Sequence, residues 1–202
     1  ELVDNYASSI VLCTATQPAL EMFFSSKDKM IELCPRMEEQ FRFFERVTYK
    51  KIGKISQEEL TMRIQEDQSV LCIVNTKKTA QELYKKLQKE EKNIYHLSTN
   101  MYPKHRKRVL KIIREQLDKN ETGIVISTSL MEARVDLDFD IVYRQIAGVD
   151  SIIQAAGRCN RNGKKDVAKS KVYIFDLIDE KKVEIRNCKL KQQHLFCKTM
   201  KK

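Results

Sequence analysis

Two arginines three residues apart stand beside a glycine in the stretch QAAGRCNRNGKK. The pair, Arg158 and Arg161, follows a short apolar run and precedes two lysines. The stretch resembles a Walker A phosphate loop, but five residues instead of four separate Gly157 from Gly163. Moreover, Lys165 stands where a Ser or Thr would bind magnesium. The two cations therefore require another explanation than a phosphate loop.

The charge balance of the chain indicates a partner that carries phosphates. Among 202 residues, 38 are Lys or Arg and 28 are Asp or Glu, which gives a formal net charge of +10 and a pI near 9.3. This excess is typical of proteins that bind nucleic acid, although a lysine-rich surface that only favours solubility has the same composition. The six cysteines form no CxxC pair, and Cys188, His194 and Cys197 lack a fourth ligand, so we expect no metal site.

Small polar residues follow three of the predicted strands. They are Asn75 and Thr76, then Ser98 to Asn100, then Ser127 to Ser129. At the ends of parallel strands such groups can bind a phosphodiester backbone, although each can also be an ordinary helix N-cap. The segment from Pro103 to Lys119 adds seven Lys or Arg against two acids, and its helical spacing predicts a cationic face for nucleic acid that consists of Lys104, Lys107, Lys111 and Arg114. We therefore predict nucleic-acid contacts at Asn75, Thr76, Ser98, Thr99, Arg106 and Thr128.

Short β-branched runs that alternate with amphipathic segments predict an α/β fold, a three-layer sandwich around a mostly parallel sheet. The expected strands are 69–75, 93–98, 123–128, 140–145 and 171–177. Helices are expected from 77 to 91 and from 103 to 119, and Ser56 with Glu59 forms a capping box before another. In the helix from 103 to 119, the residues expected to be buried are Val109, Leu110, Ile113 and Leu117. Two further strand candidates, 8–20 and 40–52, precede this region.

Four segments in order resemble the motifs of superfamily 2 helicases. They are TAT at 14–16 (motif III), CIVNTKKTAQELY at 72–84 (motif IV), VISTSLMEARVDLDFD at 125–140 (motif V) and QAAGRCNRNG at 154–163 (motif VI, QxxGRxxR). The stretches TATQP, HLSTNMYPKHR and 136–163 are similar to the CRISPR-associated helicase-nuclease of type I systems. The resemblance covers residues 8–177 and implies the second RecA-like domain of such an enzyme.

The resemblance implies a role for each matching residue. Arg158 and Arg161 correspond to arginine fingers on the γ-phosphate of ATP, and Gln154 to a glutamine near the domain interface. Asp136 corresponds to the aspartate that approaches the nucleotide ribose, and Thr128 to a contact with the nucleic-acid backbone. Hydroxyls matching Thr14 and Thr16 couple nucleotide state to domain closure. Guanidinium donors suit charge that develops on transferred phosphoryl oxygens.

The resemblance also implies a division of the chain and its partners. We expect the end of a first RecA-like domain at 1–38, the second RecA-like domain at 39–180 and a basic segment at 181–202. No Walker A loop, Walker B carboxylate or His-Asp nuclease dyad occurs in the sequence. ATP and Mg²⁺ would therefore be held mainly by the first RecA-like domain, and the chain alone would hydrolyse no ATP. The implied partners are single-stranded DNA, that domain, an HD-type nuclease domain of the same protein and an RNA-guided surveillance complex. We expect a cytoplasmic protein and no membrane contact.

One residue departs from the family pattern, which reads EAGVD in motif V. This chain reads EARVD, with Arg134 where the glycine belongs. If the position needs a backbone conformation that only glycine adopts, Arg134 strains the loop and displaces Asp136. If the backbone is ordinary, the guanidinium faces solvent or phosphate. Arg134 thus supports one alternative, a non-catalytic nucleic-acid-binding or scaffold module. A separate alternative is an RNA helicase of superfamily 2.

Overall fold

In the computed structural model, the described residues are 45–88, 93–119, 121, 123–128 and 136–178, with six isolated positions nearer the N-terminus. The predicted strand at 8–20 and the basic segment at 181–202 lie outside them, as do Thr14, Thr16 and Arg134. Within the described ranges, the predicted α/β sandwich is confirmed.

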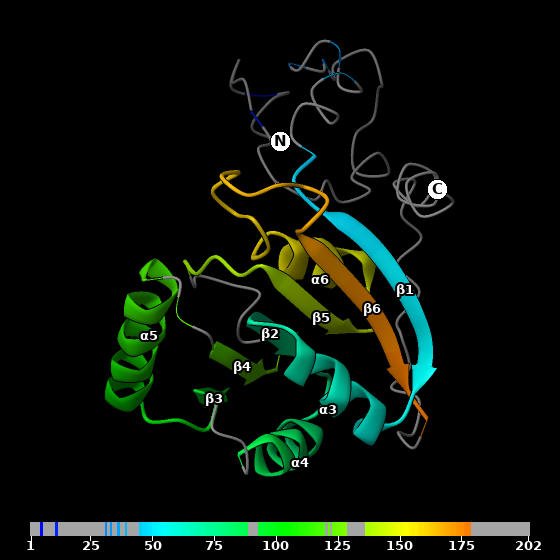
Figure 1. Cartoon of the computed structure of the whole chain (residues 1–202). Helices are drawn as coiled ribbons and strands as arrows, with labels where there is room; N and C mark the ends of the chain where they lie inside the picture. Colours follow the sequence, from blue (N-terminus) through cyan, green and yellow to red (C-terminus); the bar gives the residue numbers. More distant parts are fainter. Residues whose placement is uncertain are drawn as a thin grey trace.

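Six parallel strands form one sheet, in the order β1-β6-β5-β2-β4-β3 (Figure 1). Four helices described by the structure flank this sheet. The strands are β1 (Thr48–Ile55), β2 (Ser69–Ile73), β3 (Ile94–Leu97), β4 (Gly123–Ser127), β5 (Ile141–Gln145) and β6 (Lys171–Leu177). The helices are α3 (Gln57–Glu66), α4 (Lys77–Leu87), α5 (Pro103–Asp118) and α6 (Val149–Ala156). Each of the five strands predicted between 69 and 177 is present.

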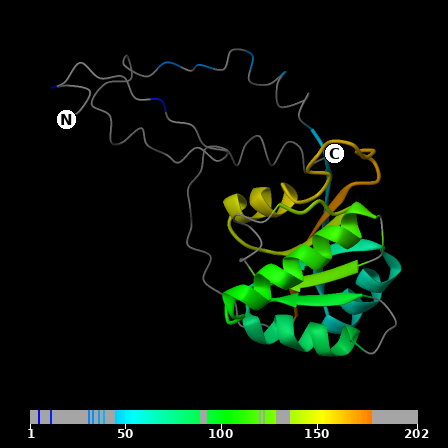
Figure 2. The same ribbon diagram turned by 90° about the vertical axis from the view of Figure 1, so that its left-hand side faces the viewer.

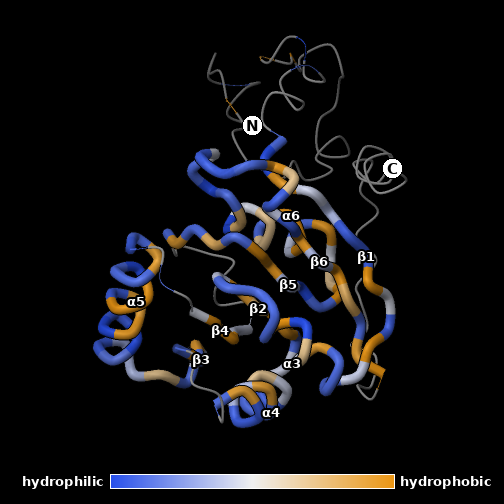
Figure 3. Tube along the Cα trace, in the orientation of Figure 1, coloured by the Kyte–Doolittle hydropathy of each residue, from blue (hydrophilic) through white to orange (hydrophobic). Residues whose placement is uncertain are grey.

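The sheet has a separate hydrophobic core on each face. Successive residues of a strand point to opposite faces, so in β2 Leu71 and Ile73 enter one core, whereas Val70 and Cys72 enter the other. Helices α5 and α6 pack on the first face, and α3 and α4 on the second. Figure 2 shows α5 in front of the strands, and Figure 3 shows its hydrophilic positions alternating with hydrophobic ones.

The helix starts follow signals that are visible in the sequence. The Ser56 hydroxyl accepts a hydrogen bond from the Glu59 amide at 3.1 Å and thereby caps α3. Pro103 occupies the first turn of α5, where a missing N–H costs no helical hydrogen bond. Of the α5 residues predicted to be buried, only Ile113 is fully so, and the others are half-buried against the same core.

Strand β1 lies at one edge of the described sheet and is interrupted by a bulge. Its pairing with β6 shifts between Lys51 and Gly53, so Ile52 is an extra residue that packs against the core. Gly53 has φ +92°, a conformation that residues with a Cβ rarely adopt. The strand starts later and ends later than the predicted 40–52 segment. Among the described helices, none has the length and apolarity needed to cross a membrane.

Candidate functional site

The predicted functional residues lie at two opposite edges of the sheet. Because the strands are parallel, Asn75, Ser98 and Thr128 follow strand ends at one edge, which we call the carboxyl edge. The loop 157–170, which carries the two arginines, lies at the other end, the amino edge. There it pairs with the chain just before β5 through a parallel bridge between Phe139 and Cys159. Figure 1 shows this loop opposite the arrowheads of β1 and β6.

Asn75 is fixed at the carboxyl edge by hydrogen bonds on all sides. Its amide nitrogen Nδ2 donates to the carbonyl of Ile146 at 2.9 Å, and its Oδ1 accepts from Arg144 Nη1 at 2.8 Å. Its backbone N–H donates to Gln145 Oε1 at 2.8 Å. Arg144 and Gln145 are each 2% exposed, so this network links β2 to β5 inside the domain. The side chain predicted to contact nucleic acid is therefore engaged within the protein.

The other predicted hydroxyl contacts at the carboxyl edge comprise one helix cap, two buried residues and one exposed residue. Thr76 caps α4 through its hydroxyl, which accepts from the Thr79 amide at 3.1 Å. Ser98 and Thr128 are buried, at 4% and 6% exposure, whereas Thr99 is exposed. Thr76 therefore acts as an ordinary helix cap, which was the alternative to nucleic-acid binding. Thr99 remains accessible to a ligand.

Cationic side chains from α4 and α5 lie at this edge. Lys77 Nζ, on α4, donates to Asn100 Oδ1 at 2.8 Å. Arg106 lies half-buried in the first two turns of α5. The predicted cationic face of this helix is exposed throughout: Lys104, Lys107, Lys111 and Arg114. Because α5 runs back across the sheet, this face extends from the carboxyl edge to the amino edge.

At the amino edge, the two predicted arginine fingers differ in exposure. Arg158 is 8% exposed, and its Nη1 donates to the carbonyl of Gly157 at 3.3 Å. Burial, followed by the charge of Arg161, lowers the pKa of Arg158, and Asp136 opposes this shift. The Arg161 side chain is 40% exposed and forms an ion pair with Asp136, with Nε to Oδ1 at 2.6 Å. Gln154 is exposed one helical turn before Arg158.

Asp136 therefore lies next to both arginines that are predicted to contact the nucleotide. Its carboxylate pairs with Arg161, and its backbone carbonyl accepts from Arg114 Nη2 at 3.2 Å. The sequence predicted Asp136, Arg158 and Arg161 separately, and the structure brings the three together. Arg114 was assigned to a nucleic-acid surface, but its hydrogen bond is with this cluster.

Asn160 holds the base of the arginine loop. Its Nδ2 donates to the carbonyls of Arg46 and Lys165, both at 2.9 Å, and its Oδ1 accepts from the Lys165 amide at 3.0 Å. It is 1% exposed and has φ 46°, in the left-handed region where Asn is tolerated better than most residues. Arg46 Nη1 also donates to the carbonyl of Arg161.

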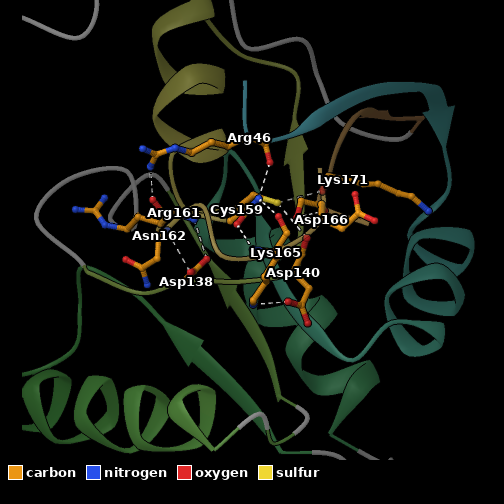
Figure 4. Close-up of polar contacts among 11 residues, drawn as sticks. Arg46, Asp138, Asp140, Cys159, Arg161, Asn162, Lys165, Asp166 and Lys171 are labelled. Carbon is orange, nitrogen blue, oxygen red and sulfur yellow. Dashed lines mark hydrogen bonds and ion pairs between the residues drawn. The ribbon is translucent and has the colours of Figure 1, made fainter. Parts of the chain in front are cut away.

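Three alternating aspartates face the loop from the segment 136–140. Asp136 binds the Arg161 side chain, Asp138 accepts from backbone amides of the loop, and Asp140 pairs with Lys165 Nζ. Leu137 and Phe139, between them, are buried at 3% and 0% exposure. Figure 4 shows Asp138 and Asp140 directed toward the loop. We call Asp136, Asp138 and Asp140 the acidic row.

Asp138 and Asn160 were not among the predicted site residues, although signals for both are present. The pattern DLDFD alternates acids with apolar residues, which is typical of an extended segment with one charged face. The sequence NRNG contains turn-forming residues, of which Asn160 adopts the left-handed conformation. Within the described ranges, no group of three His, Cys, Asp or Glu side chains is arranged to hold a metal ion.

The segment that contains this site is similar to part of a known family. Residues 66–164 match the family model described as CRISPR-associated nuclease/helicase Cas3, C-terminal. The Cas3 nuclease/helicase of Methanothermobacter thermautotrophicus is 34% identical over 117 residues, which are 57% of this chain and 13% of that protein. That of Haloferax volcanii is 43% identical over 74 residues, 36% of this chain and 8% of that protein. The chain thus spans a small part of the relatives it matches.

Solved structures agree on the fold. The structure of T. fusca Cas3 with ATP aligns with a TM-score of 0.58 and 17% identity, over 67% of this chain and 18% of that one. The C-terminal domain of the DEAD-box protein Dbp5 aligns with a TM-score of 0.53 and 18% identity, over 67% of this chain and 79% of that one. At such identity the likeness shows the fold alone. Together, the matched motifs and the curated relatives make residues 66–164 similar to the C-terminal domain of Cas3 helicases.

Proposed function

We propose that this domain is the second RecA-like half of an ATP-dependent, single-strand-translocating DNA helicase of a type I CRISPR interference system. The observation that carries the proposal is the cluster of Arg158, Arg161 and Asp136 at the amino edge, within the segment that matches the Cas3 family model. Within this motor, Arg158 and Arg161 are the arginine fingers. The whole protein's activity, substrates and partners belong to this proposal.

The donor set at the amino edge fits a nucleoside triphosphate. Two guanidinium groups can neutralise phosphate oxygens, and one carboxylate can accept from ribose hydroxyls. When bound, ATP supplies the γ-phosphoryl group that is transferred to water. The 40% exposure of the Arg161 side chain leaves part of it accessible to such a ligand, whereas Arg158 needs a change in its surroundings to reach one. Because Asp136 now pairs with Arg161, nucleotide binding must replace that ion pair.

At the carboxyl edge, the domain contacts the nucleic-acid backbone. Thr99, Arg106 and Lys77 are the side chains best placed for phosphate oxygens, because Thr99 is exposed, Lys77 donates to the neighbouring Asn100, and Arg106 lies in the first two turns of α5, which follows Thr99 in the chain. Asn75, Thr76, Ser98 and Thr128 then act mainly by shaping the backbone that presents N–H groups to the strand. Such contacts position a strand without selecting its sequence.

The remaining parts of the motor are supplied by partners. A first RecA-like domain holds Mg²⁺ and the phosphates, an HD-type nuclease domain of the same protein cleaves DNA, and an RNA-guided surveillance complex recruits it in the cytoplasm. In that arrangement Thr14 and Thr16 couple the two RecA-like domains. The separate 202-residue chain then hydrolyses no ATP above background, and measurable turnover by the purified chain contradicts this division of labour.

The decisive experiment replaces each arginine in the complete protein. Arg161→Ala lowers kcat of DNA-stimulated ATP hydrolysis by about 10³-fold, the effect typical of arginine fingers. Arg161→Lys retains the charge but not the planar donor pair, so it restores little activity. Arg158→Ala has a similar effect with an added loss of stability, because the residue is buried. Unchanged kcat in Arg161→Ala overturns the finger assignment and favours a non-catalytic module.

Strand preference separates the DNA helicase from the RNA alternative. We expect weak binding of single-stranded DNA. The logarithm of the association constant should fall linearly with the logarithm of the salt concentration, with a slope of about −0.7 for each phosphate contacted. Lys104→Gln with Lys107→Gln reduces that slope, whereas Lys50→Gln with Lys54→Gln, an equal charge change on β1, does not. Affinity independent of salt excludes phosphate contacts, and a clear preference for RNA favours the RNA helicase.

A further inference from the structure

Both carboxylate oxygens of Asp138 accept hydrogen bonds from consecutive backbone amides of the arginine loop. Oδ1 accepts from the Arg161 N–H at 2.8 Å, and Oδ2 accepts from the Asn162 N–H at 3.3 Å. One of these amides belongs to the residue that carries the exposed guanidinium. Figure 4 shows Asp138 below the loop, with both contacts drawn. A charged acceptor for two adjacent amides fixes the direction of the backbone at Arg161.

Asp138 itself stands on a rigid support. Its neighbours Leu137 and Phe139 are buried in the core, and Phe139 exchanges backbone hydrogen bonds with the loop: its N–H donates to Arg158 at 2.9 Å and its carbonyl accepts from Asn160 at 3.0 Å. The carboxylate therefore cannot move far without disturbing the first core. The loop is held at its base by Asn160 and, next to Arg161, by Asp138.

The rest of the acidic row holds side chains instead of the backbone. Asp136 pairs with the Arg161 guanidinium and Asp140 with the Lys165 ammonium. A nucleotide can displace Asp136 from Arg161, because both side chains are partly exposed. The Asp138 contacts do not involve the guanidinium, so they persist when that ion pair breaks.

We infer that Asp138 is a positioning residue for Arg161. It keeps the backbone of residues 161 and 162 fixed while the guanidinium exchanges Asp136 for the charge that develops on the transferred phosphoryl group. This inference rests on the proposed function only for the identity of that charge. Preorganised donors matter because a displacement of about 1 Å can lower a rate on the order of 100-fold.

The kinetic test uses the complete protein with Asp138→Ala and Asp138→Asn. Asparagine has one acceptor oxygen for two amides, so its effect should be intermediate. We expect kcat for ATP hydrolysis to fall about 10- to 100-fold in Asp138→Ala, with KM for ATP changed by less than about threefold, because the support acts in the transition state. Asp166→Ala is the matched control: Asp166 Oδ1 accepts from the Ala168 N–H at 2.9 Å in the same connection, away from Arg161.

A double-mutant cycle distinguishes positioning from a general structural role. In the Arg161→Ala background, Asp138→Ala should cause no further loss beyond about twofold, because it acts through the missing guanidinium. Losses that multiply show that Asp138 does not act through Arg161 and overturn the inference. If Arg161→Ala itself is fully active, the proposed finger role fails instead, so the two failures are distinguishable.

A second measurement needs no catalytic activity. In the 202-residue chain, amide hydrogen exchange at residues 161 and 162 should be slow and should accelerate at least about tenfold in Asp138→Ala. Asp166→Ala removes the acceptor for the Ala168 amide, so it should accelerate exchange at Ala168 and leave residues 161 and 162 unchanged. If these two amides exchange at the same rate in the unsubstituted chain and in Asp138→Ala, the inference that Asp138 holds the backbone at Arg161 is overturned.

Discussion

The carboxyl and amino edges of the sheet use different chemistry to fix their loops. At the carboxyl edge, the acceptors in the described contacts are neutral groups, as Gln145 is for Asn75 and Thr76 is for Thr79, and the cations Arg144 and Lys77 also donate to such groups. At the amino edge, charged groups alternate, as Asp136, Asp140 and their basic partners do. Both edges hold functional candidates, but among the contacts of the residues that the structure describes, the carboxylate–cation pairs that a phosphate ligand can exchange lie at the second.

This difference indicates how one small domain could serve two ligands. Hydrogen bonds to neutral acceptors at the carboxyl edge present a fixed surface, which in the proposed function suits a strand that slides along it. Ion pairs at the amino edge can be replaced by another anion of similar charge, which suits a site that binds and releases phosphate. The following substitutions test whether the two edges differ in this way.

Asn160→Ala should produce the largest loss of stability. Alanine leaves the carbonyls of Arg46 and Lys165 and the Lys165 amide without the partners they now have, and it must adopt φ 46°. Together these effects lower the free energy of unfolding by about 2 to 4 kcal/mol. Urea unfolding measures the change, and Asn160→Gly should recover the part that is due to backbone conformation. A loss no larger than that of a surface substitution contradicts the role of Asn160 as the anchor.

Alkaline pH should weaken the amino edge through Cys159. Burial, with added repulsion from Asp138 and Asp140, raises the pKa of this thiol from 9.0 to about 12. The folded state then keeps a proton that the unfolded chain loses, so the stabilisation is complete below pH 9 and is lost as pH rises toward 12. The slope from one such thiol is at most about 1.4 kcal/mol per pH unit. Between pH 8 and 11, the free energy of unfolding should decline less steeply in Cys159→Ala than in the unsubstituted chain. Identical slopes disprove this role of Cys159.

Thr76→Ala should give the smallest of the three effects. It removes the N-cap of α4 at the carboxyl edge, a loss of about 1 kcal/mol in thermal or urea unfolding. Thr76→Ser retains the capping oxygen and serves as the control. If Thr76→Ala destabilises the chain more than Asn160→Ala does, the contrast between a neutral, modestly stabilised edge and a strongly anchored ionic edge is wrong.

The fold could be predicted from the sequence because periodicity and capping act locally. Residues 69–73 are buried on both faces and read as a continuous apolar run, and the hydroxyl of Ser56 caps α3 as the spacing to Glu59 indicated. The bulge in β1 depends on pairing with a strand more than a hundred residues away, so no local pattern gave its position.

The candidate site could be predicted only in part. The motif arginines, Gln154 and Asp136 were identified because they match the motifs of the family that the sequence resembles. Their unequal exposure depends on packing of residues distant in sequence, such as Arg114 and Arg46 near the loop. Asp138 binds backbone amides, and a carboxylate used in this way looks like any surface acid until the turn that it faces is known.

The β1 bulge also affects how separate molecules meet. Within the described sheet β1 lies at an edge, so part of its backbone is not paired with another strand there, and eight residues are long enough to invite pairing with a second chain. Lys50, Lys51 and Lys54 are exposed along it, and the bulge at Ile52 breaks its regular register. A strand added from a neighbouring copy would meet repelling charges and mismatched hydrogen bonds. The same strand that closes the core therefore protects the domain against edge-to-edge aggregation.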